Sequence, residues 1–173
     1  MPDQIGSKVN QGKEVHLSTV RQGDRTPQQI YLAAAFFSEA EANYNISIKR
    51  ALAPFFRVFL PQESGCLMSE MIGRGMDVKE AANTVYQTDI AAIQECDILL
   101  IVLNGRAIDE GAAFELGFAA AINKPCFALQ TDTRFAHAWG NNPMIAAAVR
   151  ETFISLRELE RWASRYSIRV SAS

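Results

Sequence analysis

The feature that most constrains the fold of this chain is an unbroken apolar run at residues 98–103, which Asn104 and Gly105 follow at once. A run of leucine and β-branched residues without polar alternation is typical of a strand covered on both faces in a parallel sheet. The alanine-rich segment 112–122 comes next and is expected to form a helix. The sequence therefore predicts a central strand, a loop and a helix.

Two carboxylates lie in this segment, Asp109 in the loop and Glu115 near the start of the expected helix. Ligands of open α/β proteins bind at the carboxyl edge of the sheet, where this loop lies. Glu115 is expected in the first helical turn, where free N–H groups and the helix dipole favour an ionised carboxylate that suits a nucleophile. The alternative interpretation is structural, because acids often partner helix dipoles and Asp109 is then only a loop acid.

Strands and helices are expected to alternate through a single domain at residues 29–173, after a flexible arm at residues 1–28. Five strands fit a flavodoxin-like, doubly wound parallel sheet of order 2-1-3-4-5, with helices on both faces and ligands at the ends of strands one, three and four. The expected strands are 30–35, 57–60, 98–103, 125–129 and 152–154; the expected helices are 38–53, 79–95, 112–122, 143–149 and 156–165; the long loops are 62–75 and 131–142.

Charge and cysteine usage restrict the class of function. A formal net charge of −2 gives no electrostatic basis for binding nucleic acid or an anionic membrane. No apolar run approaches the roughly 18 residues of a membrane span, and the N-terminus lacks the apolar centre of a signal peptide. Cys66, Cys96 and Cys126 are too widely spaced for a disulfide framework or a metal knuckle, so Cys96 and Cys126 are expected in the core and a cytoplasmic location is favoured.

Several acids and one aromatic residue have both a functional and a structural interpretation. Asp89, in helix 79–95, is more often a solvent-exposed acid, although its helix could direct it towards a pocket. Asp97, eight residues later, is expected to be a cap or turn residue at the opposite end of the sheet. Tyr31 opens the first strand, where a tyrosine is more often packing than a ligand.

The remaining candidates are amides and histidines. Gln62 follows strand two at the expected pocket edge, and Asn141 and Asn142 precede Pro143, where either amide could merely cap a helix. His16 and His137 lack convincing partners. Because the sequence has no glycine-rich phosphate loop and no metal-ligand spacing, no metal and no cofactor are expected.

Taken in chain order, these segments resemble the nucleoside 2-deoxyribosyltransferase family over about residues 30–153. The most specific part is the frame EGAAFELGFA, in which Asp109 precedes Glu115 by six residues. The other parts are residues 30–33, residues 60–62, Asp89 with Asp97, residues 124–125 and residues 142–144.

The resemblance implies a role for each matched acid. Glu115 matches the nucleophile that attacks C1′ of a 2′-deoxyribonucleoside, and Asp89 matches the acid that exchanges a proton with the nucleobase. Asp109 matches the acid that holds the sugar, including its 5′-hydroxyl, and Tyr31 matches the tyrosine that orients the nucleophile. Base exchange with retention then needs two displacements through a covalent glycosyl-carboxylate, without metal or organic cofactor.

The resemblance also implies contacts with the base and between subunits. Gln62 falls where the family contacts the base, and Phe36 and Gly111 are further candidates for substrate contacts. Asn142, or Asn141 if the register shifts by one, matches an amide donated to a neighbour's sugar. A homo-oligomer is therefore expected, at least a dimer, with a hexamer built as a trimer of dimers implied by the family.

Two other functions remain open from the sequence. The first is an N-glycosidase with the same Glu115 chemistry and water as acceptor, acting on a 2′-deoxynucleoside or its 5′-monophosphate; Asp109 would repel a phosphate, so the nucleoside is favoured. The second is a non-catalytic binding domain, such as a response-regulator receiver, which shares the strand order. A receiver needs acids after strand one, where this chain has alanine and phenylalanine.

Overall fold

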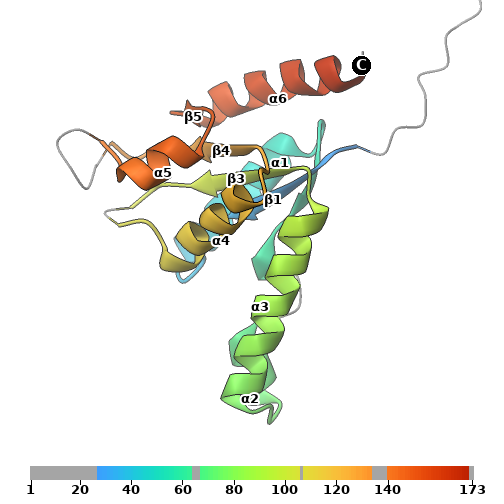
Figure 1. Ribbon diagram of the computed structural model, residues 1–173, viewed down its shortest axis with the longest axis vertical. Helices are drawn as coiled ribbons and strands as arrows, with labels where there is room; N and C mark the ends of the chain where they lie inside the picture. Colours follow the sequence, from blue (N-terminus) through green and yellow to red (C-terminus); the bar gives the residue numbers. More distant parts are fainter. Residues whose placement is uncertain (1–26, 64–66, 106, 134–139, 172–173) are drawn as a thin grey trace, which may run out of the picture.

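The computed structural model describes residues 27–63, 67–105, 107–133 and 140–171, and it shows one β-sheet between two layers of helices (Figure 1). The expected arm, residues 1–28, lies almost wholly outside the described residues, as do His16, Cys66 and His137. The elements in chain order are β1 (Gln29–Ala33), α1 (Glu39–Leu52), β2 (Arg57–Phe59), the 3₁₀ helix η1 (Pro61–Glu63), α2 (Met68–Gly73), α3 (Val78–Glu95), β3 (Ile98–Val102), α4 (Glu110–Ala121), β4 (Cys126–Leu129), α5 (Pro143–Ala148), β5 (Thr152–Phe153) and α6 (Leu156–Ser171).

The sheet is five-stranded and parallel throughout, in the order β2-β1-β3-β4-β5, as predicted. β3 is the central strand, and all five of its residues are buried. It pairs with β1 on one side, where Tyr31 faces Leu99, and with β4 on the other, where Leu99 faces Cys126. The topological switch point, where α/β proteins bind ligands, therefore lies between β1 and β3.

Side chains alternate between the two faces of the sheet and divide the core into two clusters. Ile30, Leu32 and their neighbours pack towards α1 and α6, in a cluster that includes Trp162. Tyr31 and Ala33 face the other way, in a cluster with buried residues of α3 and α4. The free thiols of Cys96 and Cys126 lie in this second cluster, as predicted.

Local hydrogen bonds set the ends of several elements. Ser38 and Glu41 form a complete capping box at the start of α1. The Asp97 carboxylate accepts from the backbone N–H of Gln29 at 2.8 Å, which ties the start of β3 to β1 and agrees with the predicted structural role. The Lys124 ammonium donates to the main-chain oxygens of Gln94 and Cys96, where α3 ends. These contacts lie at the amino ends of the strands or beside α1.

The prediction of a loop at residues 62–75 is wrong, because η1 and α2 lie there. α2 is short and buries Met71, and it packs along α3 away from the sheet (Figure 1). A six-residue helix has too few turns for a clear apolar period, and Gly73 at its end and Gly75 beyond it obscure the pattern further. α6 also continues past the predicted end at residue 165. None of the helices in the described part of the chain is long and apolar enough to span a membrane.

Candidate active site

An acid cluster surrounds the hydroxyl group of Tyr31, where β1, α3 and α4 meet. Tyr31 is fully buried, and its ring stacks on Phe59 with the centroids 5.4 Å apart. Its hydroxyl donates to Oε1 of Glu115 at 2.7 Å. Asp89, on α3, also interacts with this hydroxyl. Two carboxylates from different helices are therefore held around one fixed donor.

Asp109 is the third carboxylate, and it is the N-cap of α4. Its Oδ2 accepts from the backbone N–H of Ala112 at 2.8 Å, which caps the helix and fixes the direction of the side chain. Its negative charge acts on Glu115. The described residues contain no group of three or more histidine, cysteine or acidic side chains that could hold a metal ion.

The sequence predicted Glu115 in the first turn of its helix, and this prediction is wrong. α4 begins at Glu110, two residues earlier than predicted, so Glu110 occupies the first turn and Glu115 the second. Burial raises the pKa of Glu115 to about 8; the hydrogen bond from Tyr31 lowers it, and the charges of Asp89 and Asp109 raise it. The hydrogen bond from the Tyr31 hydroxyl, and not the N-terminus of α4, therefore stabilises the ionised form of Glu115.

Burial also shifts the pKa values of Asp89 and Tyr31. Burial raises the pKa of Asp89, and the hydrogen bond from Tyr31 opposes the shift. Burial and the charges of Glu115 and Asp89 raise the pKa of Tyr31 far above its usual range, so its hydroxyl stays neutral and donates. A raised pKa is the direction that suits a carboxyl group able to give a proton to a substrate, and this role of Asp89 stays a prediction.

The raised pKa of Glu115 predicts how stability depends on pH. Its pKa is about 8 in the folded state and near 4.5 when unfolded, so the unfolded chain releases this proton first. As far as Glu115 is concerned, the free energy of unfolding is highest below the lower pKa, and it falls as the pH rises from about 4.5 to 8. We expect Glu115→Gln to exceed the wild type in unfolding free energy at pH 9 by at least about 1 kcal/mol, with little gain at pH 4. Denaturant titrations of both proteins at the two pH values measure this difference; an equal gain at both would contradict it.

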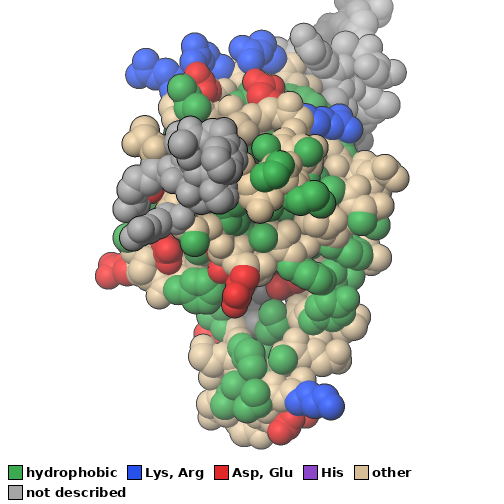
Figure 2. Space-filling view, turned by 60° about the vertical axis from the view of Figure 1, so that its left-hand side comes forward, with side chains coloured by type: hydrophobic (Ala, Val, Ile, Leu, Met, Phe, Trp, Pro, Cys, Tyr) green, Lys and Arg blue, Asp and Glu red, His purple; other side chains and the backbone are tan. Residues whose placement is uncertain are grey.

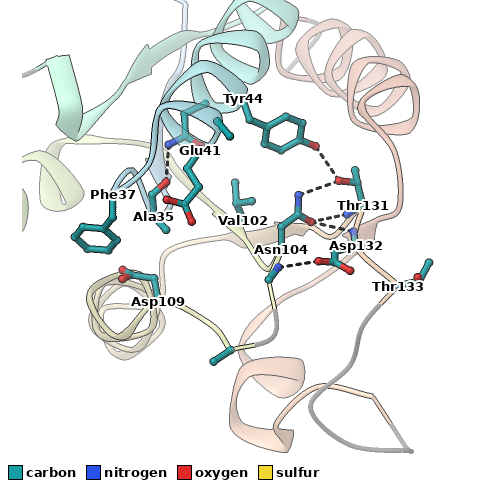
Figure 3. A pocket seen from close by; sticks show the side chains of 14 residues that line it. Ala35, Phe37, Glu41, Tyr44, Val102, Asn104, Asp109, Thr131, Asp132 and Thr133 are labelled. Carbon is teal, nitrogen blue, oxygen red and sulfur yellow. Dashed lines mark hydrogen bonds between the residues drawn. The ribbon is translucent and has the colours of Figure 1, made fainter.

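A pocket of about 910 Å³ opens at the carboxyl edge of the sheet, at the switch point between β1 and β3. Figure 3 shows Val102 between two walls, with Phe37, Glu41 and Asp109 on one side and Asn104 and Thr131 on the other. The lining residues are Ala35, Phe37, Ala40, Glu41, Tyr44, Asn45, Val102, Asn104, Gly105, Ala107, Asp109, Thr131, Asp132 and Thr133. They come from α1, from the start of α4 and from the segments that follow β1, β3 and β4, the three strands expected to carry ligand-binding residues at their ends.

Hydrogen bonds between loops hold one wall of this pocket. Oδ1 of Asn104 accepts from the backbone N–H groups of Thr131 and Asp132, at 2.8 and 3.1 Å, and its Nδ2 donates to Oγ1 of Thr131 at 2.9 Å. In return, Asp132 accepts from the backbone N–H of Gly105 at 3.2 Å. The loops after β3 and β4 are thus fixed to one another. Sequence reasoning treated Asn104 only as a strand break, although its position after the central strand was a usable signal.

Comparison with protein families decides the affiliation of the chain. The family model described as nucleoside 2-deoxyribosyltransferase matches residues 30–153, which include all of the acid cluster. The chain belongs to this family. A comparison with curated proteins finds no match.

Solved structures share the fold of this deoxyribosyltransferase family member at low identity. A conserved protein from Enterococcus faecalis V583 is 23% identical, with a TM-score of 0.64, over 82% of this chain and 99% of that one. A 2-deoxyribosyltransferase from Bacillus psychrosaccharolyticus is 24% identical (TM-score 0.58; 76% and 90% covered). A 2-desoxiribosyltransferase from Leishmania mexicana is 22% identical (TM-score 0.57; 80% and 98% covered). At these identities the likeness establishes the α/β fold.

Gln62, which the family resemblance placed near the base, is hydrogen-bonded within the protein. Its Oε1 accepts from Asn45 at 3.0 Å, and its Nε2 donates to the main-chain oxygen of Ala42 at 3.1 Å. The buried Asn45 also donates to the main-chain oxygen of Ala35. Gln62 therefore ties η1 to α1. A contact with substrate would have to use the second donor or lone pair of the amide, and it stays a prediction.

Asn142 and Asn141 lie at the start of α5 and not in the acid cluster. Oδ1 of Asn142 accepts from the backbone N–H of Met144 at 2.9 Å, so this amide is the N-cap of α5, the structural alternative considered above. Asn141 and the buried Gln130 exchange two hydrogen bonds, at 2.7 and 3.4 Å. Asn142 is exposed, and its contact with a neighbouring subunit stays a prediction.

The two remaining predicted substrate contacts have structural surroundings of their own. Phe36 stacks on Phe37 with centroids 5.7 Å apart, and it is Phe37, which is 81% exposed, that lines the pocket. Gly111 lies beside the capping carboxylate, and a Cβ there would lie 3.1 Å from Oδ2 of Asp109. Glycine at this position leaves room for that carboxylate. Sequence reasoning missed Phe37 because adjacent aromatic residues after a strand do not reveal which one faces the pocket.

Proposed function

We propose that this protein transfers the 2-deoxyribosyl group of a 2′-deoxyribonucleoside to a free nucleobase, with retention at C1′. The observation that carries the proposal is the pair of Glu115 and Asp89 at the buried Tyr31 hydroxyl, together with Asp109, whose charge acts on Glu115. Such a cluster supplies a positioned nucleophile, a second carboxyl group of raised pKa and a third acid for the sugar. Retaining glycosidases use the first two of these groups in the same way.

In the first step, a carboxylate oxygen of Glu115 attacks C1′ and the bond from C1′ to the base nitrogen breaks. The electron pair of that bond leaves with the base, and Asp89 gives its proton to the base. The missing 2′-hydroxyl makes the oxocarbenium-like transition state easier to reach. In the second step, the incoming base attacks C1′ and returns a proton to Asp89, and the bond to Glu115 breaks. Two inversions give net retention.

The proposed steps need one particular arrangement of the protons in the cluster. Burial raises the pKa of both Glu115 and Asp89, which favours one shared proton in place of two adjacent negative charges. The reactive form places that proton on Asp89 and leaves Glu115 ionised. The 2.7 Å hydrogen bond from Tyr31 stabilises this form, because a hydrogen bond to a carboxylate is stronger than one to a carboxylic acid.

Hydrolysis is the second candidate function, because the same glycosyl-enzyme can be attacked by water. The pocket beside the cluster is open at the sheet edge, which favours access of water unless another molecule covers it. The two functions differ only in the acceptor of the second step.

Incubation with deoxyinosine, with and without adenine, separates the two functions. We expect deoxyadenosine to form when adenine is present, with little free deoxyribose, as followed by chromatography. Release of hypoxanthine and deoxyribose at the same rate in both samples would identify a hydrolase. Absence of turnover with purine and pyrimidine 2′-deoxynucleosides and their monophosphates would contradict both candidates.

We also propose that the active form is a homo-oligomer, at least a dimer, in which Asn142 approaches a neighbour's site. Hydrophobic side chains gather on the lobe formed by α2 and α3 (Figure 2). The exposed ones on this lobe and the adjacent part of α4 are Met68, Ile72, Val78, Tyr86 and Phe114. An apolar surface of this kind is typical of subunit contacts. Light scattering is expected to show a dimer or larger species; a fully active monomer would contradict the shared site.

A further inference from the structure

The side chain of Tyr31 has a neighbour on each side in the sheet. Its register partner on β3 is the fully buried Leu99, and its register partner on β2 is Phe59. The ring of Phe59 is stacked on that of Tyr31, with the centroids 5.4 Å apart and the planes at 16°. Phe59 is partly buried and lies on β2, which is an edge strand of the sheet. A smaller side chain in place of Phe59 would therefore give the Tyr31 ring room to move on this side.

We propose that Phe59 is a positioning residue, which holds the ring of Tyr31 in the direction from which its hydroxyl donates to Glu115. The inference rests on the proposed function, in which Glu115 is the nucleophile. Phe59 acts through Tyr31 and takes no part in the chemistry itself, because a phenyl ring has no group that transfers a proton or attacks C1′.

The hydroxyl of Tyr31 is sensitive to the direction of the ring, because it is the side-chain atom furthest from the backbone. An O–H···O hydrogen bond spans roughly 2.5–3.0 Å. The bond from Tyr31 to Glu115 measures 2.7 Å, so a displacement of the hydroxyl by about 1 Å removes it. A leucine in place of Phe59 has no flat face on which the Tyr31 ring can stack, and it leaves space beside that ring.

Loss of this hydrogen bond changes the charge state of Glu115. Asp89 faces Glu115 from α3 and Asp109 faces it from the start of α4, and both charges favour the protonated form, as does burial. Only the hydrogen bond from Tyr31, among the described groups that act on Glu115, lowers its pKa. β3, β4 and α5 also pack on α4, and they contain no acidic or basic residue. A displaced Tyr31 ring therefore raises the pKa of Glu115 further and leaves less of it ionised near neutral pH.

Phe59→Leu tests the inference through the pH profile of kcat for exchange between deoxyinosine and adenine. We expect the acid limb of the profile to move up by at least about one pH unit, because a charge-assisted hydrogen bond shifts a pKa by about this amount. Near neutral pH, kcat should then fall about tenfold or more, and KM should stay within about threefold of the wild type. The same loss at every pH, with the acid limb unmoved, would make Phe59 a packing residue and overturn the inference.

A rescue variant and a matched control accompany this measurement. Phe59→Tyr keeps a flat ring in the same place and should restore the wild-type acid limb. The control is Phe56→Leu, because Phe56 stacks on Trp162 with centroids 5.7 Å apart and planes at 16°, but in the core cluster on the other face of the sheet. This control should lose stability without moving the limb. An equal displacement in the control, or a limb that stays displaced in Phe59→Tyr, would overturn the inference.

Circular dichroism and thermal unfolding check that each variant is folded. If Phe59→Leu does not fold, Phe59→Met takes its place, because methionine fills irregular space with a flexible chain and has no ring to stack. The same displacement of the acid limb is expected for Phe59→Met, and an unmoved limb in a folded variant would overturn the inference.

A direct measurement of the Glu115 carboxyl group keeps this inference separate from the proposed function. NMR titration of protein with isotope-labelled glutamate gives the pKa of Glu115, and comparison with Glu115→Gln assigns its signal. We expect this pKa in Phe59→Leu to exceed that of the wild type by at least about one unit, and an unchanged pKa would overturn the inference. Failure of the wild type to turn over 2′-deoxynucleosides would count against the proposed function, whereas a raised pKa in the variant would still support the positioning of Tyr31 by Phe59.

Discussion

Replacement of Glu115 by alanine is expected to lower the rate of base exchange by roughly 10⁴-fold or more, because no other carboxylate can then attack C1′ in the same geometry. Only the hydrogen bond from Tyr31 is lost from the described contacts of Glu115, so the fold should persist. Initial rates of deoxyadenosine formation from deoxyinosine and adenine measure the loss, and circular dichroism with thermal unfolding measures the fold.

The matched control for this prediction is Glu110→Ala. Glu110 is an exposed acid in the first turn of the same helix, so its replacement changes the helix dipole partner and leaves the acid cluster intact. We expect at most a severalfold change in rate and a loss of stability of about 0.3–1 kcal/mol. Two results would show that Glu115 is not the nucleophile: substantial transfer by the alanine variant, or a loss of folding that makes Glu115 a structural residue.

Replacement of Asp89 by asparagine is expected to lower the rate by about 10²- to 10⁴-fold, the usual contribution of a positioned acid or base. Asparagine has nearly the same shape, and its amide can donate a hydrogen bond to the Tyr31 oxygen, but it has no acidic proton to give to the leaving base. The loss should therefore depend on the donor. It should be largest for a base that needs protonation to leave, and smallest for an activated leaving group such as p-nitrophenol.

A series of donors with leaving groups of different pKa provides the measurement. Glu80→Gln, an exposed position in the first turn of α3, serves as the control and should retain the wild-type dependence on the leaving group. An equal loss for every donor in the Asp89 variant would show that Asp89 binds the substrate without transferring a proton.

Most of the fold could be predicted from local patterns. The uninterrupted apolar run at residues 98–103 predicted a central strand, and β3 is buried throughout and paired on both sides. The capping box of Ser38 and Glu41 predicted the start of α1. Strand burial, caps and helical periods depend on residues close together in the chain, which is why these predictions were correct. α2 was missed because a helix of six residues is defined mainly by its packing against α3.

The sequence singled out Tyr31, Asp89, Asp109 and Glu115, which the structure brings together, but it did not predict their electrostatics. Their roles stay predictions. The spacing of Asp109 and Glu115 after a central strand pointed to the edge of the sheet where the pocket lies, and the family resemblance gave roles to Asp89 and Tyr31. Their meeting around one hydroxyl is a tertiary result, because Tyr31 and Glu115 are 84 residues apart in the chain. The pocket that Phe37 lines likewise required the ends of three strands to be placed.

The sequence by itself determined where the strands lie along the chain and which loop carries Asp109, because both follow from local apolar patterns. Only the tertiary structure decided which form of Glu115 is favoured. The sequence suggested an ionised carboxylate at a helix terminus, whereas burial in the second turn of α4 raises its pKa to about 8. Desolvation and the charges of Asp89 and Asp109 cause this shift, and they depend on groups that folding brings from several elements.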